Sequence, residues 1–153
     1  MATSDIIQYL SGAAADVGTS ARRVVETFLC GSNAVGTPIA AGDWVAFEPA
    51  ATDGLESITV IKAATNAAGN PLVCGVALEA GTAVGQRIKV VTRGYVADAA
   101  VTSSVPAGPL AVDASAGRAE QYDTTNHSAP VCGISLAEAA DNKADVIVCG
   151  TFR

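Results

Sequence analysis

The sequence predicts a mainly β protein: a small β-sandwich or barrel (β-tulip-like) built from two related halves, with an extended N-terminal arm. Three observations predict this class. Short segments rich in Val, Ile and Thr alternate with turns that contain Gly, Asn or Pro. A pair of related segments, about 38–96 and 104–153, forms an internal repeat. The 31 Ala, 15 Gly and few aromatic residues suit short strands and tight turns better than a helix bundle.

The first 20 residues differ from the rest and predict an N-terminal arm ahead of a single β-domain over residues 21–153. Four apolar side chains gather near the start of the arm: Ile6, Ile7, Tyr9 and Leu10. A run of small residues at 11–15 follows them. Free chain termini are usually disordered, whereas these apolar residues offer anchors. The segment could therefore be a short helix that seals the base of its own domain or an arm that docks on a neighbour, and both stay open.

Three segments predict individual strands. Residues 23–29 (RVVETFL) are rich in β-branched residues and end at a Gly-Ser-Asn turn. Residues 57–62 (SITVIK) alternate with period two, and residues 86–90 (QRIKV) alternate polar with apolar side chains as a half-buried antiparallel strand does. Turns separate the predicted strands at 53–54, 69–71, 80–81, 84–85 and 107–109.

The internal repeat indicates that the domain arose by duplication. Residues 71–80 (PLVCGVALEA) recur as 130–138 (PVCGISLAE), and 87–94 align with 144–150. Upstream, the alignment is looser and matches Trp44 with Leu110. Each copy comprises a turn, a strand, a variable hairpin, a Cys-Gly strand, an acidic turn and a strand that ends at Gly. Two copies are too few for a solenoid, so they predict one closed or sandwiched β-domain.

The four cysteines each follow an apolar residue and precede a glycine: Cys30, Cys74, Cys132 and Cys149. This pattern favours a small buried residue at a strand position beside a turn or bulge glycine. A disulfide stays open, because spacing alone does not reveal pairing. A zinc site is disfavoured, since the chain has no CxxC pair and a single His.

The charge balance argues against nucleic-acid partners, and the short apolar runs argue against a membrane. Nine Lys and Arg against 15 Asp and Glu give a net charge of −6, which repels a phosphate backbone. No apolar run approaches the roughly 18 residues that span a bilayer. The first twelve residues lack the basic and apolar regions of a secretory signal. We therefore expect a protein that is made and kept in the cytoplasm, or assembled there.

The sequence predicts no enzyme, and no catalytic, cofactor-binding or metal-binding residue. His127 is the single imidazole, and a Cys132–His127 nucleophilic pair is disfavoured because the repeated Cys74 has no matching His. Acidic residues are scattered at turns, where they are normally solvated. The glycine-containing segment 30–37 lacks the Lys of a phosphate-binding loop. Trp44 with Phe47 could stack on a sugar or base, but such residues are more typical of the few large fillers of an Ala-rich core.

Three segments in order carry a family resemblance: residues 41–45 (AGDWV), 74–94 (CGVALEAGTAVGQRIKVVTRG) and 107–113 (AGPLAVD). This series resembles the small capsid cement (decoration) proteins of tailed bacteriophages, over roughly residues 36–150. The resemblance implies a homotrimer on the outer capsid surface that clamps neighbouring copies of the major capsid protein and is assembled in the host bacterial cytoplasm. An acidic chain without catalytic apparatus is compatible with this role.

The resemblance implies that the arm and the first strand are the candidate contacts with the capsid or with neighbouring subunits. The candidate residues are Ile6, Ile7, Tyr9, Leu10, Arg22, Arg23, Val25 and Thr27. The strand at 23–29 could pair with the edge of a neighbour's sheet. Two other classes stay open: another virion module (tail, head fibre or baseplate), and a small carbohydrate-binding β-module that would use Trp44, Tyr95 and Tyr122.

Overall fold

A computed structural model describes residues 23–32, 36–51, 54–64, 72–125 and 131–149. The predicted arm lies outside these ranges, as do Arg22 and His127. The described residues form one mixed sheet of nine strands and no α-helix, which confirms the predicted mainly β class. The strands are β1 (Arg23–Cys30), β2 (Trp44–Phe47), β3 (Thr59–Lys62), β4 (Val73–Ala77), β5 (Arg87–Ala100), β6 (Gly108–Val112), β7 (Ala119–Gln121), β8 (Gly133–Ser135) and β9 (Lys143–Val148).

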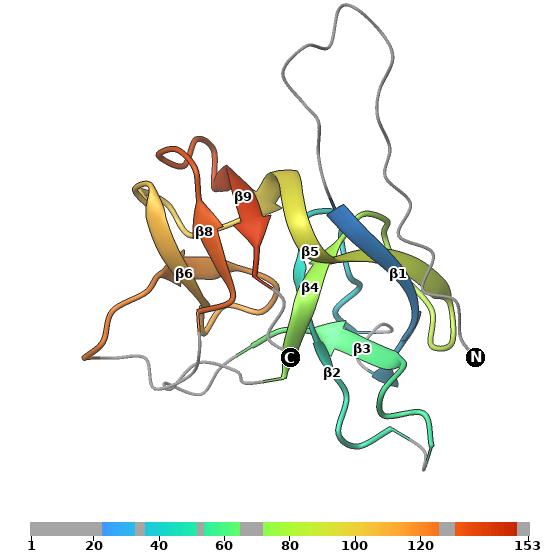
Figure 1. Ribbon diagram of the computed structural model, residues 1–153. Coiled ribbons are helices and arrows are strands. Elements are labelled where there is room, and N and C mark those ends of the chain that lie inside the picture. The colour runs from blue at the N-terminus through green and yellow to red at the C-terminus, as the bar shows by residue number, and fades with distance from the viewer. Residues whose placement is uncertain (1–22, 33–35, 52–53, 65–71, 126–130, 150–153) are drawn as a thin grey trace, which may run out of the picture.

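The first five strands close into a barrel. They pair in the order β1-β3-β2-β4-β5, and β1 closes the ring by pairing antiparallel with β5 (Figure 1). Inward-facing apolar side chains fill its interior: Phe28, Cys30, Ile39, Val45, Val60, Cys74, Ala77, Ile88 and Val90. The predicted strands at 23–29, 57–62 and 86–90 all contribute to this barrel, although β3 begins only at Thr59.

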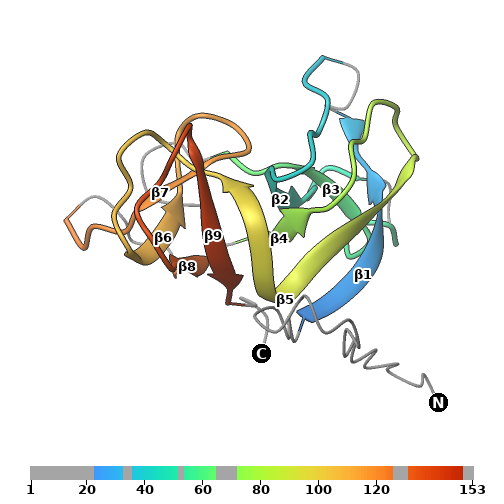
Figure 2. The ribbon, with the colours of Figure 1, turned by 90° about the horizontal axis from the view of Figure 1, so that it is seen from above.

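The long strand β5 joins the two halves of the molecule. The sequence predicts a strand that ends at Gly94, and this is wrong: β5 continues to Ala100. Gly94 has a φ of +102°, a conformation that a glycine adopts without strain, so the strand changes direction there without ending. Beyond Gly94, β9, β8, β6 and β7 follow in order (Figure 2). Figure 2 shows β1 beside the first part of β5 and β9 beside its second part.

The two halves repeat the same topology, as the duplication predicts. The order β3-β2-β4-β5 in the first half matches β7-β6-β8-β9 in the second. The second part of β5 takes the place that β1 holds in the first half. The Gly31 N–H donates to the Val60 carbonyl at 2.8 Å, and the Thr102 N–H donates to the Ala119 carbonyl at 2.8 Å. One strand therefore serves as the last strand of one half and the first strand of the other.

The structural match between the halves corrects the upstream alignment by one residue. Val45 lies opposite Gly75, and Leu110 lies opposite Gly133. Val45 therefore corresponds to Leu110, whereas the sequence alignment matched Trp44 with Leu110. A shift of one residue turns a side chain to the opposite face of a strand. Trp44 accordingly points out of the first barrel and into the core of the second half.

The equivalent cysteines occupy equivalent buried sites. The Cys74 thiol donates to the Val45 carbonyl at 3.5 Å, and the Cys132 thiol donates to the Leu110 carbonyl at 3.3 Å. All four cysteines are free, and three are buried, so the prediction of buried small residues is confirmed for Cys30, Cys74 and Cys132. Desolvation by burial raises the pKa of Cys74 and that of Cys132 to about 12. A nucleophilic thiol needs the opposite shift.

We expect the two buried thiols to make the fold sensitive to alkali. The pKa of each thiol is about 12 in the folded chain, against the ordinary value of 9.0. As the pH rises above 9, the unfolded chain therefore loses two thiol protons that the folded chain still holds. Stability should fall between pH 9 and 12 by about 1.4 kcal/mol per pH unit for each thiol. Urea unfolding at pH 8, 9, 10 and 11 checks this. The Cys74→Ala/Cys132→Ala double variant should show a flatter profile, and an equal slope in both proteins would refute the assignment.

Candidate docking edge

Three of the candidate contact residues lie on β1, and all three are exposed: Arg23, Val25 and Thr27. A strand in a closed barrel normally buries every second side chain. In β1 the first five residues are all exposed, and burial begins only at Phe28. Val24 is 39% and Val25 is 40% exposed. The first part of β1 therefore extends beyond the packed interior and presents apolar side chains to solvent.

One edge of this first part is open. β1 pairs with β5 from Arg23 to Leu29 on one side, but with β3 only at Leu29 and Cys30 on the other. The Leu29 N–H donates to Ile58 on the β3 side at 2.8 Å, and the Cys30 N–H donates to Gln86 on the β5 side at 2.8 Å.

The direction of the backbone groups follows from this alternation. Successive residues of a strand point their N–H and C=O groups to opposite sides. Thr27 and Val25 therefore share the side of Leu29, where no strand within the described ranges pairs with them. A row of unpaired backbone N–H and C=O groups is a template for an added strand. The geometry is compatible with strand addition, although β1 is already paired within its own chain on the β5 side.

The end of β1 is held by a buried carboxylate. Glu48 accepts hydrogen bonds from the Ser32 backbone N–H at 3.1 Å and from the Ser32 hydroxyl. A Cβ atom at Gly31 would lie 2.2 Å from the Glu48 carboxylate, so only glycine leaves room for this contact. The C-terminal end of β1 is thus fixed while its first part projects with an open edge.

A band of positive charge accompanies the open edge. The ribbon formed by β1 and β5 carries four basic residues, Arg23, Arg87, Lys89 and Arg93, against two acidic ones, Glu26 and Asp98, although acidic residues outnumber basic ones by 15 to nine in the whole chain. Lys89 lies opposite Thr27, and Arg93 lies opposite Val24. Neither Arg87 nor Arg93 forms an ion pair with another residue of the described part of the chain. We call these four residues the basic ribbon.

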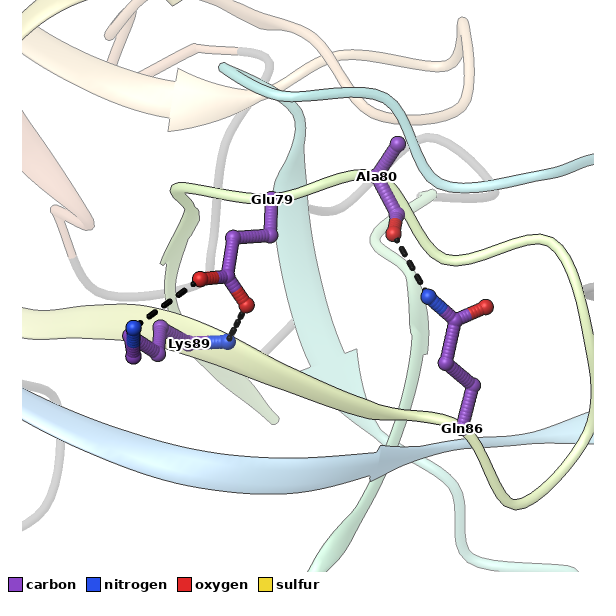
Figure 3. A network of polar contacts seen from close by, with 4 residues as sticks. All are labelled: Glu79, Ala80, Gln86 and Lys89. Carbon is purple, nitrogen blue, oxygen red and sulfur yellow. Dashed lines mark hydrogen bonds and ion pairs between the residues drawn. The ribbon is translucent and has the colours of Figure 1, made fainter.

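Among the residues that the structure describes, Lys89 is the one member of the basic ribbon that forms an ion pair. Its ammonium lies 3.1 Å from the Glu79 carboxylate, which also accepts the Lys89 backbone N–H at 3.2 Å (Figure 3). The hydrogen bond from Lys89 is the main cause that lowers the pKa of Glu79. The Gln86 side chain donates to the Ala80 carbonyl at 3.0 Å and closes the same loop. This network orders the turn that leads into β5.

The other candidate sites in the described residues are less suited to binding. Trp44 is fully buried and its indole N–H donates to the Ala100 carbonyl at 3.0 Å, so a stacking role is wrong and the core role is confirmed. An open depression of about 420 Å³ is lined mainly by acidic and alanine side chains, among them Asp98, Glu138 and Asp141. Within the described ranges, no three His, Cys, Asp or Glu side chains are placed to hold a metal ion.

The comparisons with known proteins do not assign the chain to a family. No protein-family model matches it, and no curated protein matches it significantly. The described residues contain no helix that is long and apolar enough to cross a membrane. The sequence interpretation included Arg23 but missed Arg87, Lys89 and Arg93. Their alternation along one strand was a usable signal, but its meaning depended on knowing that β1 lies beside them.

Proposed function

We propose that this chain is a structural virion protein that binds the outer surface of a bacteriophage capsid and cements neighbouring copies of the major capsid protein. In this role it stabilises the expanded head and works as a homotrimer. The resemblance of its turn-and-strand motifs to capsid cement proteins supports the proposal. The structural observation that carries it is the open edge of β1, at Val25 and Thr27, beside the basic ribbon.

The contact chemistry follows from the edge. A strand of the partner would pair with the outward backbone groups of Val25 and Thr27, as in β-strand addition. The exposed side chains of Val24 and Val25 would lose water in the same contact. The basic ribbon would face acidic side chains of the partner and speed docking. Because many copies bind one shell, modest single contacts would sum to a large stabilisation of the assembled head.

Heads of the same phage prepared without this chain provide the direct binding test. We expect the purified chain to co-sediment with expanded heads to saturation and to raise the temperature at which the heads lose their DNA. Binding to tails or baseplates with none to heads would replace the proposal with the other virion role. Binding to glycans alone would favour the carbohydrate-binding alternative, which has lost Trp44 as a contact.

Charge reversal in the basic ribbon should weaken head binding. Arg93→Glu replaces a cation, which forms no ion pair within the described ranges, by an anion. We expect a roughly 10-fold loss of affinity at low salt, and this loss should shrink as salt screens the charges. The matched control is Arg118→Glu, because Arg118 is exposed and precedes β7, away from the ribbon. Co-sedimentation at 50 and 500 mM NaCl measures both variants. Equal losses for the two variants would show that net charge, not the ribbon, controls binding.

A further inference from the structure

Exposed apolar side chains gather around the open edge of β1. Val24 and Val25 lie on the strand itself, and Leu55 and Ile58 lie just before β3, where they are 39% and 41% exposed. The Ile58 N–H donates to the Leu55 carbonyl at 3.0 Å, and the Ile58 carbonyl accepts the Leu29 N–H at 2.8 Å. This turn therefore stands at the end of the open stretch. An added strand would find both unpaired backbone groups and apolar side chains here.

An open edge with apolar neighbours is a liability in a free chain. Unpaired backbone N–H and C=O groups promote edge-to-edge aggregation, and natural proteins commonly cover such edges. No strand within the described ranges lies on this side of Val25 and Thr27. A segment that covers the edge must therefore come from the rest of the chain or from another molecule.

The chain supplies a segment of suitable length at the right place. Twenty-two residues precede Arg23, where the open stretch begins. Residues 6–10 (IIQYL) are their apolar run and are about as long as the open stretch at 23–28. The 12 residues at 11–22 connect the two. Fully extended, such a connection spans about 40 Å, whereas neighbouring strands lie only about 4.8 Å apart. The run can therefore return along β1 in the antiparallel direction.

Charge and tethering favour the chain's own arm as the occupant. The arm has two charged side chains, Asp5 and Asp16, and both are opposite in sign to the basic ribbon beside the edge. A short tether holds a segment near its site at an effective concentration on the order of millimolar. A separate chain in dilute solution is far less concentrated than this, so it competes poorly with the tethered arm.

We propose that residues 6–10 of the chain's own arm pair with the β1 edge in the free protein and leave it when the capsid strand binds. One edge accepts one strand, so the arm and the partner compete for the outward backbone groups of Val25 and Thr27. This regulation rests on the proposed function, which it deepens by naming what controls the docking edge. The apparent affinity for heads is then the intrinsic affinity reduced by the fraction of chains whose edge is covered.

Amide hydrogen exchange on the full chain without heads tests the arm contact. We expect the Val25 and Thr27 N–H groups to exchange at least 10-fold more slowly in the full chain than in a chain that lacks residues 1–10. The Glu26 N–H points toward β5 and is the internal control, so its exchange should change far less. Equal exchange of Val25 and Thr27 in the two proteins overturns the arm contact.

Proline variants separate strand pairing from the loss of chain length. Successive residues of a strand point to opposite sides, so one of the two prolines in Ile7→Pro/Gln8→Pro must face β1 and remove a hydrogen bond. Exchange at Thr27 should then be as fast as in the shortened chain. The matched control is Ala14→Pro/Ala15→Pro in the connecting residues, which should keep the slow exchange. Protection that weakens on dilution would assign the contact to the arm of another copy and overturn pairing within one chain.

Head binding distinguishes the arm contact from the proposed function. The shortened chain should bind heads more tightly, by the same factor by which its Thr27 exchange is faster. Unchanged or weaker binding by the shortened chain would overturn the competition. Slow exchange at Thr27 in a full chain that binds no heads, with no binding by the shortened chain, would support the arm contact and refute the proposed function. Fast exchange with normal head binding would do the reverse.

Discussion

Replacing Trp44 by Ala is expected to cost about 3–5 kcal/mol of stability, the usual range for removing a large buried aromatic side chain. Trp44 is fully buried, contacts the core of the second half and donates its indole N–H to the Ala100 carbonyl. The cavity would open at the joint between the halves. We therefore expect β8 and β9 to lose protection from hydrogen exchange before the strands of the first barrel do.

Val45→Ala is the matched control for this effect. Val45 is the next residue along β2 and is equally buried, but it belongs to the core of the first barrel. Its truncation should cost about 1–3 kcal/mol and should lower protection in the first barrel instead. Urea unfolding with hydrogen exchange on both variants makes the comparison. If both substitutions loosen the same strands, the joint does not depend on Trp44.

Placing proline at the open edge should abolish head binding and spare the fold. Thr27→Pro removes an N–H that faces away from β5, and proline is tolerated on an edge strand when that side faces solvent. We expect a stability change within about 1 kcal/mol and a loss of binding of 100-fold or more, because the partner strand loses a hydrogen bond and meets the proline ring.

Two further substitutions isolate the backbone effect of Thr27→Pro. Thr27→Val keeps the N–H and a similar volume, so its head binding should stay close to wild type. Glu26→Pro removes an N–H that points toward β5, so it should destabilise the fold more than Thr27→Pro does, because a hydrogen bond of the β1–β5 ladder is lost. Co-sedimentation with heads and thermal unfolding read out all three variants. Normal head binding by Thr27→Pro would exclude strand pairing at this edge.

Local patterns in the sequence were enough to predict the class of fold and most strands of the first barrel. The alternating residues at 86–90 and the β-branched run at 23–29 predicted strands because side-chain periodicity and β-propensity act over a few residues. The repeat of the Cys-Gly strand predicted two related halves. These features require no knowledge of which strands are neighbours.

The remaining features depend on contacts between distant residues. The one-residue shift that sets Val45, not Trp44, opposite Gly75 depends on pairing between β2 and β4. The continuation of β5 past Gly94 depends on β9 pairing with its second part. The basic ribbon exists only because β1 lies beside β5, although the two are far apart in the sequence. Spacing within one segment does not specify such contacts.

The most direct test of the central claim is a cryo-EM reconstruction of expanded heads incubated with the purified chain. The proposal predicts trimeric density on the outer surface at three-fold or quasi-three-fold positions. It also predicts that the edge of β1 at Val25 and Thr27 lies against the major capsid protein. Heads without added density at saturating concentrations of the chain, or density in which the β1 edge points to solvent, would contradict it.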